Sequence, residues 1–128
     1  MNRYGIKGTF NLNYELMQQK FEWVHESGLV VKRLSESVVY DLYQGHEVAS
    51  HSLTHPSLDN MPEEAILYEL GHDKWCLSQL FGREIAGFGV PFDYYDHHIA
   101  EYAKRLGFEY VRTSEESYSY VPPKDPYF

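Results

Sequence analysis

Apolar and polar residues alternate along the chain in a way that predicts short strands separated by helices. Residues 8–12 alternate and are rich in β-prone residue types, which predicts a first strand that begins near residue 5. Two further β-branched or aromatic runs, at 21–24 and 29–31, are separated by residues 25–28, which are typical of a hairpin turn. An amphipathic helix over the first half of that region is the alternative interpretation.

Three helices are predicted from residues that can cap them and from apolar residues that share one face. Ser35 is predicted to cap a helix over residues 36–44, and Asp96 a helix that ends before Gly107. Asn60 is predicted to cap a longer helix that ends near Phe81, with Pro62 in its first turn and Glu63 completing a capping box. Cys76 falls inside the second helical pattern, where it is predicted to be a small buried hydrophobe.

Short apolar strands are predicted between these helices, at residues 48–49, 85–90 and 108–112. Strands that alternate with helices predict βαβ units and a parallel sheet, in which binding groups gather on loops at the strand ends. No repeat or linker interrupts residues 1–128, so the pattern predicts an α/β fold in a single domain. The Pro-rich tail at 114–128 has no period and predicts a loop, which leaves the sheet without closure on either side.

Composition and charge exclude several classes of partner. The formal net charge is −8, and the Lys and Arg residues form no basic cluster, so nucleic acid is not an expected partner. No segment approaches the roughly 18 apolar residues of a membrane span, and the N-terminus lacks the apolar stretch of a secretory signal. The sequence as written therefore predicts a cytoplasmic protein with no membrane segment.

The residues with the clearest chemistry are His51 and His55, which follow the short strand at 48–49. That position is a strand end, where an α/β domain places its ligands, and a spacing of four residues would put both imidazoles on one helical face. Neutral imidazole is the commonest ligand for zinc and related divalent ions, but a catalytic zinc normally has three protein ligands. With seven His in the chain, two solvated histidines are the alternative.

The string GHEVASHSLTHPSL at 45–58 resembles the second motif of the polysaccharide deacetylase family, which is also known as the NodB-homology domain and carbohydrate esterase family 4. Residues 5–10 resemble the second strand of that family, and residues 33–35 the approach to the helix before the histidines. Residues 87–93 resemble its third motif, and residues 107–113 the strand that follows. The segments come in the family's order, so the resemblance covers nearly the whole chain and corresponds to the middle of the domain.

The resemblance implies a part of a distorted (β/α) barrel that lacks the first strand and the C-terminal part. It also implies metal-dependent hydrolysis of N-acetyl or O-acetyl groups on a carbohydrate such as peptidoglycan or chitin. In the family, two histidines matching His51 and His55 hold zinc or another divalent cation together with an Asp; cobalt and nickel are the alternatives here. Pro91 and Phe92 match a segment that walls the substrate groove.

The chain departs from the family pattern in several places. The two aspartates of the family belong to a strand that should precede residue 5, and its acid His belongs to a motif beyond residue 128, so the catalytic residues are unknown. Gly89 stands where the family often has Arg, and Asp93 where it has Gly. Asp93, on the loop after a predicted strand, is the candidate third metal ligand.

The simplest roles for the other polar residues of this region are structural or solvated. Asp96 is predicted as an N-cap, His46 as a structural residue, and His25, His72, His97 and His98 as solvated surface residues. The alternative to an active enzyme is a truncated family member that binds metal or glycan without turnover, with self-association through open sheet edges. Family members are frequently exported, so export is the alternative location if the N-terminus is truncated.

Overall fold

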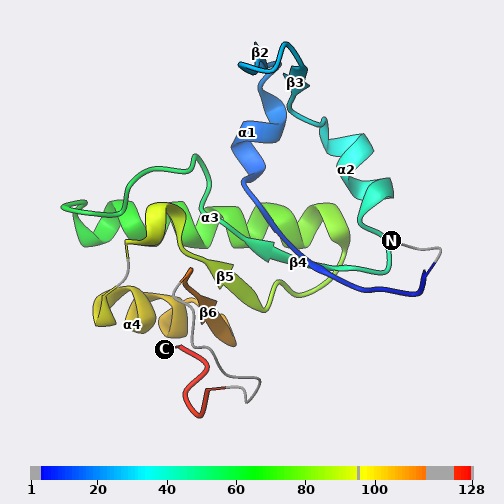
Figure 1. The fold of residues 1–128 in the computed structure, drawn as a ribbon. Coiled ribbons are helices and arrows are strands. Elements are labelled where there is room, and N and C mark those ends of the chain that lie inside the picture. Colours follow the sequence, from blue (N-terminus) through cyan, green and yellow to red (C-terminus); the bar gives the residue numbers. More distant parts are fainter. Residues whose placement is uncertain (1–3, 95, 115–122, 128) are drawn as a thin grey trace.

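The computed structural model describes residues 4–94, 96–114 and 123–127. The elements, in chain order, are β1 (Thr9–Leu12), α1 (Tyr14–Gln18), β2 (Glu22–Val24), β3 (Val30–Lys32), α2 (Glu36–Leu42), β4 (Glu47–Ser50), α3 (Glu63–Phe81), β5 (Gly87–Gly89), the short 3-10 helix η2 (Pro91–Asp93), α4 (His97–Arg105) and β6 (Tyr110–Arg112). Figure 1 shows their arrangement.

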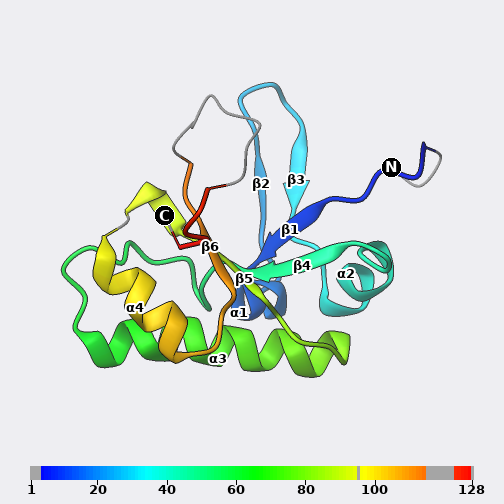
Figure 2. The ribbon, with the colours of Figure 1, turned by 90° about the horizontal axis from the view of Figure 1, so that it is seen from below.

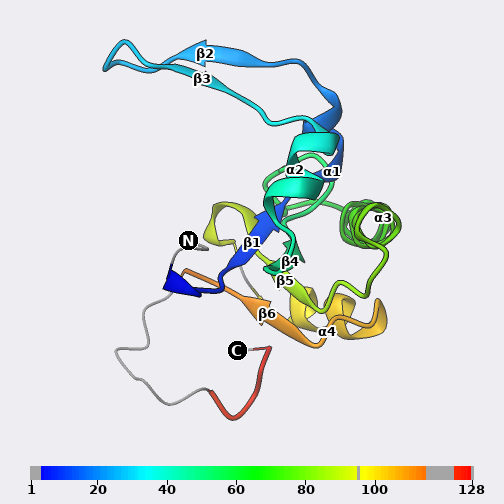
Figure 3. The same ribbon diagram turned by 90° about the vertical axis from the view of Figure 1, so that its right-hand side faces the viewer.

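The predicted parallel sheet is present. Its strand order is β1-β4-β5-β6, and each of the three pairings is parallel. Helices α3 and α4 lie side by side along one face of this sheet, whereas the hairpin of β2 and β3 extends from the other side (Figures 2 and 3). The α/β class and the partial, unclosed form of the fold are therefore confirmed.

The apolar core lies between the sheet and the two helices. Val48, Phe88 and Val111 come from three neighbouring strands and are at most 7% exposed. They belong to one cluster with residues of α3 such as Leu70 and residues of α4 such as Ile99. Successive residues of a strand point to opposite faces. The neighbours of these core residues along each strand therefore point to the other face of the sheet, which the helices leave uncovered.

Helix α3 begins differently from the prediction. Its N-cap position is Pro62, which makes no side-chain cap, and Asn60 lies before the helix with a φ of 57°. The capping box at Asn60 is therefore wrong; the turn Leu58–Met61, closed by a 3.4 Å hydrogen bond, separates Asn60 from the first helical turn. The helix ends at Phe81 as predicted, and Gly82 adopts the left-handed conformation that commonly follows a helix.

The other element predictions fare unequally. Asp96 caps α4 as predicted, since its carboxylate accepts hydrogen bonds from the backbone N–H groups of His98 (2.8 Å) and Ile99 (3.2 Å). Ser35 is the N-cap residue of α2, but its side chain makes no capping hydrogen bond. The hairpin is confirmed over the helical alternative, whereas α1 was not predicted.

The two edges of the sheet differ. At the β6 edge, the backbone N–H of Val111 donates to the carbonyl of Pro126 (3.0 Å), and the hydroxyl of Tyr127 donates to the carbonyl of Phe108 (2.5 Å). The outer edge of β1 pairs with no other described strand. The predicted self-association through open edges stays a prediction, and the β1 edge is the one that no described segment covers.

The remaining fold-level predictions concern the tail, the cysteine and membranes. The described part of the tail, residues 123–127, is a loop, and the rest of the predicted loop at 115–122 and 128 lies outside the described residues. Cys76 is a free, buried thiol, as predicted. Within the described ranges, the helices are too short or too polar to traverse a bilayer.

Candidate metal centre

The loop after β4 holds both histidines, but it is not the helical turn that their spacing suggested. Ser52 and His55 have φ values of 67° and 60°, in the left-handed region, which interrupts any helix. The backbone N–H of His51 donates to the carbonyl of Leu12 (2.8 Å), and that of His55 donates to Oγ of Ser52 (3.2 Å). This tight turn still brings the two imidazole rings together, with centroids 4.8 Å apart.

A carboxylate from α3 fixes the same loop. Glu69 is only 9% exposed, and it accepts hydrogen bonds from the backbone N–H (2.9 Å) and the hydroxyl (2.8 Å) of Thr54. From the other side, the amide of Asn13 donates to the carbonyls of His51 (2.5 Å) and Ser52 (2.8 Å). A loop held this way keeps its left-handed residues in place, because surrounding contacts offset their strain.

A second buried acid of α3 joins the end of β4 to the start of α1. Asp73 is fully buried and accepts hydrogen bonds from Oγ of Ser50 (2.6 Å) and the backbone N–H of Tyr14 (2.7 Å). Burial raises the pKa of this carboxyl group to about 7, even though its hydrogen bonds favour the charged form. The buried roles of Asp73 and Glu69 were not predicted. Their spacing of four residues, among the apolar residues of α3, is the feature of the sequence that could have indicated them.

A backbone carbonyl fixes the orientation of the His51 ring. Nδ1 of His51 lies 2.8 Å from the carbonyl oxygen of Gly89, which can only accept, so Nδ1 carries the proton. Nε2 is then the lone-pair nitrogen, and such a carbonyl contact is the usual support of a metal-binding His. Burial lowers the pKa of His51, the hydrogen bond to Gly89 raises it in part, and the neighbouring His55 and Arg112 lower it further; the net lowering favours the neutral form that a metal needs.

The 3-10 helix η2 places an aromatic ring against the other histidine. The ring of Phe92 lies with its centroid 4.6 Å from that of His55 in an edge-on arrangement, and 66% of Phe92 is exposed. Phe92 and Asp93 have φ values of 53° and 59°, whereas Pro91 is buried. Left-handed non-glycine residues on both loops mark this end of the sheet as a place where packing enforces strain, as at many functional sites.

The predicted third ligand does not join the pair in this structure. Among residues 4–94, 96–114 and 123–127, no three His, Cys, Asp or Glu side chains are grouped so that they could hold a metal ion. Asp93 is exposed on η2, and its role as a ligand stays a prediction. His97 and His98 are exposed at the start of α4, and His46 is buried, with its Nδ1 accepting from the backbone N–H of Gly8 (3.2 Å).

Polar side chains lie across the uncovered face of the sheet. Glu47 on β4 accepts hydrogen bonds from the hydroxyls of Thr9 on β1 and Tyr110 on β6, the latter at 2.8 Å. The Tyr110 ring passes directly over Gly87 on β5, where any side chain would collide with it. Burial, followed by the contact with Glu47, raises the pKa of Tyr110 to about 12.

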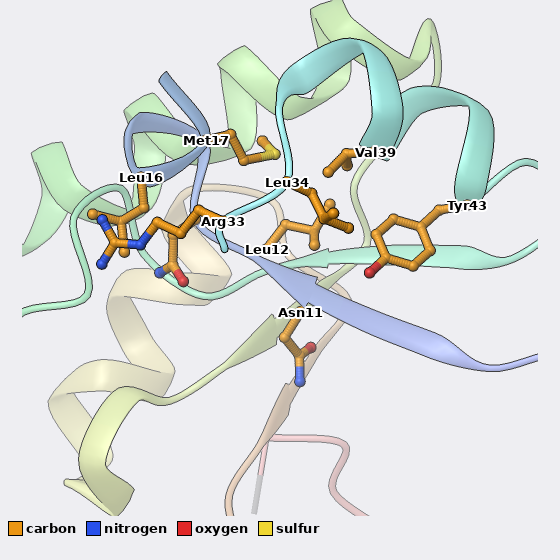
Figure 4. A pocket seen from close by; sticks show the side chains of 9 residues that line it. Asn11, Leu12, Leu16, Met17, Arg33, Leu34, Val39 and Tyr43 are labelled. Atoms are coloured by element: carbon orange, nitrogen blue, oxygen red, sulfur yellow. The ribbon is translucent and has the colours of Figure 1, made fainter. Parts of the chain in front are cut away.

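Two hollows in the described part of the chain lie away from His51 and His55. One of about 220 Å³ is shown in Figure 4, where its apolar residues include Leu12, Met17 and Val39 and lie on one side of β1. Asn11 also lines it, but its side chain points away from these residues, below the strand in Figure 4. A hollow of about 390 Å³ lies at the opposite end of the strands, beside His46. His51 and His55 line neither of these hollows, and both are half-buried.

Comparisons with solved structures show the same fold in several deacetylases. The Streptococcus pyogenes deacetylase PplD in complex with acetate is 19% identical (TM-score 0.74), with 89% of this chain and 47% of that chain covered. A carbohydrate esterase 4 pseudoenzyme from Bacillus anthracis, BA3943, is 14% identical (TM-score 0.68; 86% and 34% covered). The Bc1960 peptidoglycan N-acetylglucosamine deacetylase is 17% identical (TM-score 0.67; 86% and 45% covered). The chain thus spans less than half the length of each.

The sequence comparisons identify the family. No curated protein matches the chain. The sequence model of the family described as "Polysaccharide deacetylase" matches residues 1–111, which is most of the chain. That match includes the histidine loop, η2, strands β1, β4 and β5, and the first two residues of β6. The chain therefore belongs to the polysaccharide deacetylase family.

Proposed function

We propose that the chain carries the histidine ligands of a metal-dependent deacetylase that removes acetyl groups from a carbohydrate. The observation that carries this proposal is the orientation of His51: its Nδ1 proton is committed to the carbonyl of Gly89, and its ring lies beside that of His55. A half-buried loop histidine whose one nitrogen is fixed by a carbonyl is arranged to offer the other nitrogen as a ligand.

The donor set fits a divalent cation that accepts imidazole. His51 and His55 would supply two ligands, and zinc is the metal most often bound this way, with cobalt and nickel as alternatives. When bound, such an ion polarises an acetyl carbonyl and lowers the pKa of a bound water. The chain's own contribution is to hold both rings, through Glu69 and Gly89, and to keep His51 neutral.

The carbohydrate is proposed from the family and from the exposed residue next to the histidines. Pro91 and Phe92 would wall the substrate groove, because the exposed Phe92 ring offers a flat apolar surface to a sugar. The Bc1960 enzyme is named for N-acetylglucosamine in peptidoglycan, which makes N-acetylated sugars the first substrate class to test. The catalytic base and acid are not assigned, and Asp93 remains the candidate third ligand.

The test is release of acetate from N-acetylglucosamine oligomers with zinc, cobalt or nickel added. Acetate release above the metal-free level is expected, and the H51A/H55A double variant should abolish it. The H72A variant is the matched control, since His72 is exposed on α3 and should leave the rate unchanged. Full metal occupancy without acetate release would contradict the enzymatic part of the proposal.

That outcome defines the alternative function, a member that binds metal or glycan without turnover. It is worth testing because the fold occurs in the BA3943 pseudoenzyme as well as in deacetylases. Under this alternative, H51A/H55A would still lose metal, while binding of the oligomers, measured by calorimetry, would persist without hydrolysis. The two functions therefore differ in turnover and agree on the histidine site.

A further inference from the structure

Three polar side chains lie around Gly89 on the uncovered face of the sheet: Asn11 of β1, His51 directly after β4 and Arg112 of β6. The carbonyl of Gly89 holds His51. A Cβ placed on Gly89 would lie 2.9 Å from Cγ of Asn11, so the Asn11 amide occupies the space above this glycine. Arg112 is the residue that pairs with Gly89 in the parallel register of β5 and β6. In-register residues of neighbouring strands project from the same face, so Arg112 belongs to this side as well.

The floor beneath these groups consists of small residues. Ala49, which pairs with Asn11, lies on β4, and Gly87 and Gly89 lie on β5. Because none of them has a long side chain, those of the outer strands β1 and β6 can reach inward, as the Tyr110 ring does over Gly87. The Asn11 amide reaches inward from the opposite edge, toward Gly89.

The guanidinium of Arg112 has no hydrogen-bonding partner among the described residues, unlike those of the other arginines in the described part of the chain. Arg33 donates to Gln19 (3.0 Å), Arg83 to the carbonyl of His46 (2.6 Å), and Arg105 to Glu63 (2.5 Å). The backbone carbonyl of Arg112 accepts from Val90 (3.0 Å), and its charge acts on His51 and Tyr110, but its guanidinium makes no hydrogen bond, ion pair or ring contact with any described residue. The Asn11 amide is likewise without a hydrogen bond to any described residue.

We propose that Asn11 and Arg112 form a carboxylate-binding subsite beside His51 on the uncovered face of the sheet. A guanidinium presents two parallel N–H groups that match the two oxygens of a carboxylate, and an amide N–H₂ adds a further donor. The inference deepens the proposed function and rests on it for the source of the ligand. The carboxylate is either the acetate that deacetylation releases or the acid group of an acidic sugar in the polymer.

Titrations of the metal-free protein, kept in chelator, test this subsite with sodium acetate and with glucuronate. Side-chain resonances of Arg112 and Asn11 should shift on binding in ¹H–¹⁵N spectra. R112Q should weaken binding by roughly tenfold or more, because a hydrogen bond to a charged group contributes about 1.5–3 kcal/mol. R112K should lose less, since it keeps the charge but not the fork, and N11A should lose a smaller factor. R105Q, which changes an arginine on α4, is the matched control and should bind as the wild type does.

The two probes separate the sources of the carboxylate. Saturable binding of acetate without a preference for glucuronate assigns the subsite to the product, and tighter binding of glucuronate assigns it to an acidic sugar. The proposal is overturned if neither probe shifts the Arg112 or Asn11 resonances, or if R112Q binds as tightly as the wild type. Zinc binding by the same samples, measured without chelator, tests the histidine pair separately, so failure of the subsite and failure of the metal site are distinguishable.

Discussion

The two faces of the sheet, built from the same four strands, have opposite chemistry. The face under α3 and α4 is apolar, and Val48, Phe88 and Val111 are buried there against both helices. The uncovered face carries Thr9 and Glu47 in hydrogen bonds. Alternation along each strand therefore separates the two faces: one supplies most of the hydrophobic stabilisation, and the other presents polar groups.

Buried polar groups of α3 interrupt this division near the end of β4. Asp73 is a carboxyl group on the covered side, and it holds Ser50, the last residue of β4, directly before His51. The position of the histidine loop therefore depends on buried polar contacts of α3 as well as on the sheet. Variants on each face, and at this junction, can separate these contributions.

The largest effect is expected from a truncation on the covered face. Phe88 is 0% exposed at the centre of the core, so F88A should lower the free energy of unfolding by about 3–5 kcal/mol. The matched control is F92A, since Phe92 is 66% exposed and its removal should cost less than about 0.5 kcal/mol. Urea unfolding followed by circular dichroism measures both. Equal losses for the two variants would mean that the faces do not differ in stability.

The buried carboxyl group of Asp73 is expected to make the free energy of unfolding depend on pH. The pKa of Asp73 is about 7 in the folded chain, against 3.8 for an ordinary Asp, so the folded state holds this proton more tightly than the unfolded state. Stability from this group is fully present below about pH 4 and falls as the pH rises to about 7, by on the order of 3–4 kcal/mol. D73N, which resembles the protonated form, should flatten this part of the profile and be more stable than the wild type at pH 8. An unchanged slope in D73N, measured by urea unfolding at several pH values, would assign it to other groups.

Replacing a glycine of the uncovered face with a larger residue is expected to destabilise the fold. G87A places a methyl group in the position of the Tyr110 ring, so it should displace that ring, break its hydrogen bond with Glu47 and cost about 1–3 kcal/mol. The double variant G87A/Y110A should lose less than the sum of the two single variants, since the collision is absent. Strict additivity in urea unfolding would show that the Tyr110 ring does not depend on Gly87.

The smallest effect concerns substrate contact and rests on the proposed function. F92A should raise KM for N-acetylglucosamine oligomers by roughly twofold to tenfold and leave kcat nearly unchanged, because an aromatic contact contributes about 0.5–1.5 kcal/mol to binding. The measurement is the rate of acetate release over a range of oligomer concentrations. A fall in kcat at constant KM would instead place Phe92 in support of His55.

Much of this organisation was predictable from local patterns. Alternation identified β1 and β6, and short apolar runs identified β4 and β5. The chemistry of Asp96 identified the start of α4, and the motif at residues 45–58 identified His51 and His55. Each of these signals lies within a few residues of sequence, where spacing and capping chemistry act directly.

The remaining features depend on contacts between distant parts of the chain. The hydrogen bond from the backbone N–H of Tyr14 to Asp73 joins residues that lie 59 positions apart in the sequence. The one from the backbone N–H of Thr54 to Glu69 joins residues 15 positions apart. The left-handed turn at His55 exists because such contacts hold it, so the spacing of the histidines alone suggested a helix in its place. The predicted cap at Asn60 is wrong because the turn before α3, closed by a backbone hydrogen bond, determines where that helix begins.

The most direct test of the central claim is zinc binding by the purified chain. Equilibrium dialysis followed by metal analysis should find zinc bound at up to one ion per chain, and H51A/H55A should lose it. The H25A/H72A double variant, which removes two exposed histidines, should keep the wild-type content. Zinc content that is unchanged in H51A/H55A would contradict the claim that these two residues form a metal site.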